Sequence, residues 1–263
     1  MPMGKILGYQ EVFVAGGFPS HTYNPRDSLQ LETKLADSLK NLCKLVVITG
    51  HTKSGKTVLA RKIVPQDKAI WVDGGTASQE EEFWQIIVDG LGLAQEYQKQ
   101  VTEGTVQTLG TEGKAEVGIL MAKATGQLSW DLSKKHENSI SSSKNLSSRV
   151  VALQGLKDSR IPLVIDDFHY LPIELQGSIV RALKQLIFDG LPVVIIAIPH
   201  RRYDAMKVER EMTARIMPIN IPAWSDEELQ FIPNSGFSLL GYNVPPGNTL
   251  RLAHESIGSP HLM

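Results

Sequence analysis

The stretch GHTKSGKT, residues 50–57, directly follows an apolar run that begins LVVI at residues 45–48. It is an unbroken G-x-x-x-x-G-K-T pattern between a run typical of a buried strand and a segment, VLARKIV, typical of an amphipathic helix. Such glycines let backbone N–H groups turn toward a triphosphate, and the next helix presents its positive N-terminal end. The sequence therefore predicts a nucleoside triphosphate site formed by Gly50, His51, Thr52, Lys53, Ser54, Gly55, Lys56 and Thr57.

Hydrolysis at such a loop also needs a metal ligand and a group that positions water. We expect Lys56 to reach the β- and γ-phosphates and Thr57 to place its hydroxyl on Mg²⁺. The run LVIDD, residues 163–167, puts two aspartates at the end of another buried strand, where strand ends converge on a ligand. Asp166 is the predicted metal ligand, and Asp167 is the candidate catalytic base, or else a loop or helix-capping acid. Because aspartate is shorter than glutamate, slow hydrolysis is expected.

Composition is that of an ordinary globular protein. The chain has 263 residues, 42% of them hydrophobic and 21% charged, with a formal net charge of −1. This overall balance does not indicate nucleic acid or an anionic membrane as a partner. Cys43 is the only cysteine, which excludes an internal disulfide and fits a reducing compartment. With no run approaching 18 apolar residues, we expect a cytoplasmic protein without a membrane partner.

The order of apolar runs indicates the fold class. Runs typical of buried strands alternate with segments of helical period, among them residues 26–42 and 173–189, and Gly190 is well placed to end the second. This alternation predicts an α/β protein, a three-layer sandwich with a mostly parallel central sheet, as in P-loop NTPases. Residues 1–221 form the predicted nucleotide-binding domain, with strands at residues 45–48, 69–72, 163–165, 193–198 and 216–221.

Residues from about 105 to 149 are predicted to be an insert in this domain. They are rich in Gly, Ser, Lys and Gln, with one apolar patch at residues 117–121, and the tail ENSISSSKNLSSR reads as a mobile loop. The apolar patch predicts a hairpin or short helix that touches a partner, or else a surface excursion without a role.

Residues 222–263 are predicted to form part of a helical lid. Ser225 and Glu228 have the spacing of a capping box, so a short helix is expected from there to Pro233, and a second helix is expected around residues 248–256. Ser259 followed by Pro260 is typical of a helix start. The sequence thus predicts that the chain stops inside a helical subdomain.

Cationic side chains follow the fourth predicted strand and precede the fifth. Residues 199–202 read PHRR, so His200 or Arg201 could sense the γ-phosphate, or either could cap the strand end in solvent. Arg215, and after it Arg210, is a candidate arginine finger given in trans to a neighbouring subunit. The alternative is an exposed helix whose charges pair locally.

These motifs, in this order, resemble the AAA+ and STAND branches of P-loop NTPases from about Val12 to Met263, apart from the insert. The Asp-Asp pair is more similar to STAND signalling ATPases, since AAA+ motors carry Asp-Glu. The resemblance implies adenine contacts by Tyr23 or Arg26, although the G-R-E letters usual there are missing. Residues 258–260 resemble the G-x-P element of the STAND lid, which implies that Pro260 lies near the nucleotide. Arg251, the only candidate for a sensor arginine of the lid, sits one helix early.

The same resemblance implies a regulatory switch. STAND proteins hold ADP at rest, exchange it for ATP on sensing a partner, form oligomers and switch on an effector on the same longer chain or in trans, often in bacterial signalling or antiviral defence. An initiator or transposition adaptor acting on DNA is the alternative, since ORC/Cdc6-like ATPases share this layout. Its basic surface would be residues 134–136 and 201–202. A small-molecule kinase is a third reading, less favoured because the lid is weakly charged.

Overall fold

The computed structural model describes residues 7–93, 147–198, 212 and 214–263. Within these ranges the chain forms a five-stranded sheet of order β2-β3-β4-β1-β5, in which every neighbouring pair is parallel. The strands are β1 (Leu45–Gly50), β2 (Ile70–Asp73), β3 (Leu163–Asp166), β4 (Val193–Ala197) and β5 (Ile216–Ile221). All five lie within two residues of the predicted runs, so the α/β prediction is confirmed.

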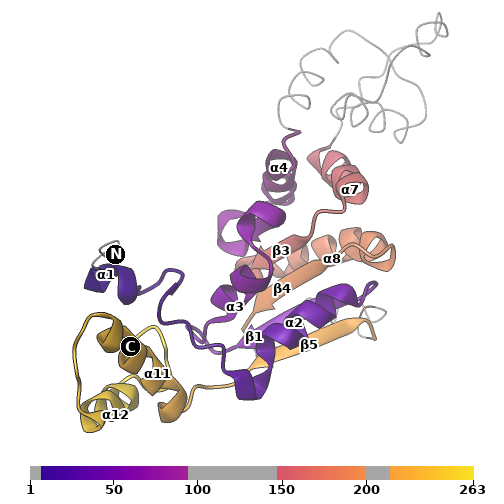
Figure 1. Cartoon of the computed structure of the whole chain (residues 1–263). Coiled ribbons are helices and arrows are strands. Elements are labelled where there is room, and N and C mark those ends of the chain that lie inside the picture. Colours follow the sequence, from indigo (N-terminus) through magenta and orange to yellow (C-terminus); the bar gives the residue numbers. More distant parts are fainter. Residues whose placement is uncertain (1–6, 94–146, 199–211, 213) are drawn as a thin grey trace, which may run out of the picture.

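Helices cover both faces of this sheet (Figure 1). One face packs against α4 (Glu80–Gly90), α7 (Ser148–Ser159) and α8 (Ile173–Phe188). The other packs against α2 (Leu31–Lys40) and α3 (Lys56–Ile63). Short 3-10 turns complete the connections at Asp27–Leu29, Gln66–Lys68, Gly74–Thr76 and Phe168–Tyr170. No helix in the described ranges combines the length and apolar character needed to cross a membrane.

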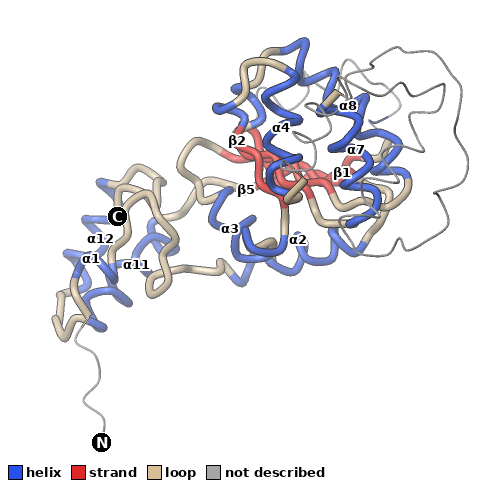
Figure 2. Tube along the Cα trace, turned by 90° about the horizontal axis from the view of Figure 1, so that it is seen from above, coloured by secondary structure: helices blue, strands red, loops and turns tan. Residues whose placement is uncertain are grey.

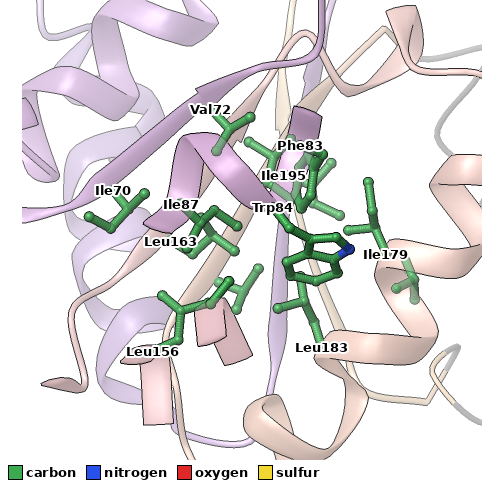
Figure 3. Packing of buried hydrophobic residues seen from close by; sticks show 14 of the residues in the cluster. Ile70, Val72, Phe83, Trp84, Ile87, Leu156, Leu163, Ile179, Leu183 and Ile195 are labelled. Atoms are coloured by element: carbon green, nitrogen blue, oxygen red, sulfur yellow. The ribbon is translucent and has the colours of Figure 1, made fainter. Parts of the chain in front are cut away.

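Alternate residues of the central strands enter opposite layers of the core. Val47 lies in the cluster formed with α4, α7 and α8, whereas Val46 and Ile48 lie in the cluster formed with α2 and α3. The first cluster centres on Trp84 of α4, whose ring lies close to Ile87, Ile179 and Leu183 in Figure 3. Burial on both faces explains why the strands read as continuous apolar runs.

Because all strands run the same way, their carboxyl ends meet at one edge of the sheet. The phosphate loop follows β1 there, Asp166 ends β3, and Asp73 pairs with Asp166 in the ladder between β2 and β3. This edge is where open parallel sheets bind ligands.

Helix α7 begins inside the segment predicted to be a mobile loop. Ser147 is its N-cap and accepts a hydrogen bond from the Arg149 backbone N–H. Arg149 also contacts Glu80 of α4 through its guanidinium, at 2.9 Å. The prediction of a loop up to residue 149 is therefore wrong for its last three residues, since capping and an ion pair order them. The rest of the predicted insert, up to residue 146, lies outside the described residues.

The helical region after β5 consists of α11 (Asp226–Leu239) and α12 (Pro246–Glu255). We call residues 222–263 the lid. Leu229, Ile232 and Ala253 form its own small core, against which Phe13, Trp224 and Met263 pack. The lid stands to one side of the sheet with the short helix α1 (Tyr9–Val12) beside it (Figures 1 and 2). The N-terminal segment thus packs on the lid, 200 residues away in sequence.

Two predictions for the lid are wrong. Helix α11 does not end at Pro233 but continues to Leu239, because Pro233 is buried on the same face as Leu229 and Ile232, and packing there offsets the lost hydrogen bond. The capping box of Ser225 and Glu228 is present as predicted.

No helix begins at Ser259 either. The left-handed residues Ile257 and Gly258 reverse the chain, and Leu262 N–H donates to the Ser259 carbonyl in a turn. Met263 then packs against the lid core, so the chain folds back on the lid where a new helix was expected.

Candidate functional site

The phosphate loop has the backbone shape that its sequence predicts. Lys53 and Gly55 are left-handed, with φ of 61° and 92°, and the Ser54 N–H donates to the His51 carbonyl at 3.2 Å. Helix α3 then starts at Lys56, so its N–H groups without helical partners face the loop. Backbone donors and a helix N-terminus together make a site for an anion such as a phosphate.

Lys56 is buried inside this loop. Its ammonium donates to the Gly50 carbonyl at 3.1 Å and to the His51 carbonyl at 2.7 Å, and the residue is only 7% exposed. Burial lowers the pKa of the Lys56 ammonium, while the Asp167 and Asp166 carboxylates oppose this shift. The loop thus holds a cation whose charge is little screened by water.

Thr57 and Asp166 lie together as predicted. The Thr57 hydroxyl is 3.2 Å from Asp166 Oδ1, which also accepts from the Asp167 N–H at 2.9 Å. Burial raises the pKa of the Asp166 carboxyl, although the Thr57 hydrogen bond opposes the shift. Adjacent hydroxyl and carboxylate oxygens are the donors that Mg²⁺ prefers, with phosphate oxygens and waters completing the set, so these residues fit that ion.

The two aspartates have different environments. Both contacts just described hold Asp166 in place, whereas the Asp167 side chain is 45% exposed and lines the cavity described below. Asp167 is left-handed, with φ of 48°, a conformation that costs energy in a non-glycine residue and is frequent at functional sites. The geometry thus separates a fixed metal-side carboxylate from one available to water.

Asp73 and Gly74 belong to this edge but were not predicted from the sequence. The Asp73 carboxylate is close enough to contribute to the raised pKa of Asp166. A Cβ added at Gly74 would lie 2.6 Å from the Asp167 carbonyl oxygen, so only glycine allows this approach. The feature of the sequence that could have indicated this close approach is the glycine pair at 74 and 75, directly after a strand.

One cavity of about 520 Å³ joins the loop to the lid. Loop residues 52–57 and Asp167 form one wall, and the N-terminal segment, residues 13–17 and 22–26, forms another. The lid closes it with Trp224 and residues 260–263. Pro260 thus lines the cavity, and its place near a nucleotide stays a prediction. His169 and Tyr170, which follow the aspartate pair, also line it.

Tyr23 lies in the wall of this cavity. Burial, and after it the nearby Glu32 carboxylate, raises the pKa of the Tyr23 phenol above its ordinary range. Its ring stacks on Phe18 with centroids 6.4 Å apart, and the Lys62 ammonium lies 5.3 Å from its centroid. An adenine contact by Tyr23 stays a prediction.

Arg26 connects the N-terminal segment to the lid. Its side chain is 3% exposed, and its guanidinium makes four hydrogen bonds: two to the Glu228 carboxylate and one each to the Pro222 and Ala223 carbonyls. Four of five donors are therefore occupied by the lid. An adenine contact by Arg26 stays a prediction. The four hydrogen bonds described here join the N-terminal segment to the lid.

Trp224 was not singled out from the sequence. It lies between β5 and α11, and its indole N–H donates to the Ser54 carbonyl at 2.9 Å. The Arg26 guanidinium stacks on its ring, 4.6 Å from the centroid. Trp224 belongs to no motif, and only its place just after the last strand could have pointed to it.

Arg215 lies at the start of β5, at the edge of the sheet opposite to the phosphate loop. Its guanidinium stacks on Phe188, 4.0 Å from the ring centroid. Arg215 is therefore not part of the nucleotide site of its own chain, and its action on the site of a neighbouring subunit stays a prediction. His200, Arg201 and Arg210 lie outside the described residues, as do residues 134–136 and 202 of the DNA alternative.

Together, the sheet order, the loop after β1 and the aspartate ending β3 define a P-loop NTPase. No family model and no curated protein matches the sequence of the chain. Solved structures do match.

The ORC2 protein of Aeropyrum pernix in its ADP form is similar with a TM-score of 0.57 and 14% identity, over 96% of this chain and 64% of that one. Cdc6p of Pyrobaculum aerophilum is similar with a TM-score of 0.56 and 13% identity, over 96% of this chain and 62% of that one. A STAND protein with a tetratricopeptide repeat sensor from Pyrococcus horikoshii has a TM-score of 0.48 and 18% identity, over 87% of this chain and 28% of that one. The chain shares the fold of the ORC2 and Cdc6p structures, and it spans under two thirds of each of these three proteins.

Asp166→Asn should make the protein without nucleotide more stable at neutral pH. Because the pKa of Asp166 is raised in the folded state, this carboxyl stabilises the fold below its ordinary pKa of 3.8, and the contribution is lost as pH rises through the folded value. The amide does not ionise. The melting temperature of the variant minus that of wild type should therefore grow from about pH 4 upward and then level off. A pH-independent difference, or one shared by the exposed control Asp67→Asn, would contradict this assignment.

Gly74→Ala should slow nucleotide hydrolysis. The added Cβ must displace the backbone at Asp167, and misplacing a catalytic group by about 1 Å costs on the order of 100-fold in rate. Gly75→Ala is the matched control, since its Cβ would meet side chains and no backbone, namely Asp73 at 3.2 Å and Tyr170 at 3.9 Å. Phosphate release in a single turnover measures the effect. Equal rates in the two variants would show that Gly74 does not position Asp167.

Proposed function

We propose that this protein is an ATP-binding switch that hydrolyses its nucleotide slowly and controls a partner. One observation carries the proposal: a single cavity is walled by the phosphate loop, by Asp167 and by the lid. A nucleotide held there contacts both the sheet domain and the lid, so its state can set the lid position. Preference for ATP over other nucleotides rests on the likeness to the ORC2 structure in its ADP form.

Binding uses groups already in place. The N–H groups of residues 52–57 and the Lys56 ammonium meet the phosphates, while the base lies between the N-terminal segment and residues 260–263. Thr57 and Asp166 would hold Mg²⁺, which when bound would neutralise charge on the phosphate oxygens.

Hydrolysis depends on Asp167. Its partly exposed carboxylate faces the cavity and orients a water toward the γ-phosphate, accepting its proton. The short aspartate side chain supports a slow rate, which suits a timer that holds its nucleotide for long periods. ATP and ADP then correspond to two states of one switch.

We further propose that the switch works as a nucleotide-dependent homo-oligomer. Arg215 lies on the edge of the sheet opposite to the loop, where its guanidinium packs on Phe188, and in an oligomer it would reach the site of a neighbouring subunit. The partner controlled is a sensor or effector on the same longer chain or in trans, in bacterial signalling or antiviral defence. This extension is motivated by the resemblance of Asp166-Asp167 and residues 258–260 to STAND proteins.

Two variants separate binding from hydrolysis. Lys56→Ala should weaken ADP and ATP binding by about 100-fold, since charge-assisted contacts to phosphate are lost. Asp167→Asn should bind ATP as wild type does but release phosphate about 100-fold more slowly. Fluorescent nucleotide titration and phosphate release measure the two effects, with the exposed Lys68→Ala as control. Wild-type affinity in a folded Lys56→Ala protein would refute the nucleotide site.

The oligomer predicts complementation between two inactive variants. Arg215→Ala lacks the finger but keeps the site, whereas Asp167→Asn keeps the finger and lacks the base. Mixing them should restore part of the phosphate release, because some interfaces combine an intact Asp167 with an intact Arg215. Light scattering with ADP, ATP and a non-hydrolysable analogue checks assembly. One size under all three conditions, with no restored activity, would refute assembly and action in trans.

A further inference from the structure

We propose that Trp224 is a positioning residue through which the lid sets the orientation of the Ser54–Gly55 peptide, and with it the affinity for the β-phosphate. The inference rests on the proposed nucleotide site and names a control element within it. Its starting point is the 2.9 Å hydrogen bond from the indole N–H to the Ser54 carbonyl.

A trans peptide ties its two polar groups together. The carbonyl oxygen of Ser54 and the N–H of Gly55 point in opposite directions, because all six atoms of the peptide unit are nearly coplanar. Trp224 holds the carbonyl on its own side, so the Gly55 N–H points away from the indole. Gly55 directly precedes α3, where backbone N–H groups have no helical acceptor and can face a phosphate.

This peptide is able to rotate unless something holds it. Lys53 and Gly55, on either side of Ser54, are both left-handed, and glycine at 55 has access to a wide range of conformations. The Ser54 hydroxyl is buried and has no hydrogen-bond partner within the described part of the chain, so the side chain adds no polar anchor. The indole N–H is the contact that fixes the carbonyl.

Trp224 in turn is held by the lid and the N-terminal segment together. The Arg26 guanidinium stacks on the indole and is itself fixed by Glu228 of α11 and by the Pro222 and Ala223 carbonyls. Trp224 lies between the end of β5 and the start of α11, so rotation of the lid moves it. A displaced lid therefore frees the Ser54 carbonyl and weakens the phosphate site.

The test compares three variants of the whole chain by calorimetric titration with ADP and with AMP. Trp224→Phe keeps an aromatic ring but lacks the N–H, Glu228→Gln weakens the hold on Arg26 and leaves the indole intact, and Trp71→Phe is the control. Trp71 also carries an arginine over its ring, Arg61 at 5.7 Å, yet its indole N–H has no acceptor among the described residues. Lys56→Ala reports separately on the nucleotide site.

Trp224→Phe should weaken ADP binding about three- to tenfold, the usual effect of one lost hydrogen bond, and AMP binding by less than about twofold, since AMP has no β-phosphate. Glu228→Gln should act in the same direction, and Trp71→Phe should bind like wild type. Unchanged ADP affinity in both Trp224→Phe and Glu228→Gln, while Lys56→Ala loses binding, overturns this inference alone. Equal losses for ADP and AMP overturn it too, because they indicate general loosening of the lid. Wild-type binding by Lys56→Ala overturns the proposed function itself.

Discussion

Strand β1 is paired on both sides, and the position of every group in the site depends on that pairing. It is hydrogen-bonded in parallel to β4 and to β5, and all six of its residues are buried. Both faces of β1 are buried, so a shift by one residue would exchange the side chains that pack into the two helix layers and disrupt both clusters. The loop that follows β1 therefore starts at a fixed position along the sheet, which lets the Thr57 hydroxyl reach Asp166 at the end of β3.

Local chemistry explains which parts could be predicted from the sequence. The buried strands are continuous apolar runs, and Ser225 and Glu228 form the predicted capping box, because these features depend on neighbours in the chain. The pairing of Thr57 with Asp166 was predictable because parallel strands bring their carboxyl ends together. The end of α11 was predicted wrongly at Pro233 for the opposite reason. The low helix propensity of this one residue is outweighed by its packing in the folded lid, which the local sequence does not show.

The parts that could not be predicted are contacts between segments far apart in sequence. The residues around Arg26 in the sequence do not indicate that its guanidinium donates four hydrogen bonds to the lid. Those around Trp224 do not indicate that its indole N–H donates to the Ser54 carbonyl. Gly74 becomes special only when the aspartate pair of β3 lies against it. Each of these contacts joins segments that are far apart in sequence, so no local pattern of residues indicates it.

The Arg26–Glu228 pair also has a consequence for the order in which the molecule assembles. Its partners are 202 positions apart, so during synthesis the buried cation of the N-terminal segment is not neutralised until the chain has been made as far as Glu228. The sheet can form earlier, since its strands need only one another and their covering helices. Until Glu228 has been made, the nascent protein has a phosphate loop but lacks the wall of the cavity that the lid supplies, so the proposed nucleotide site is completed only after the sheet.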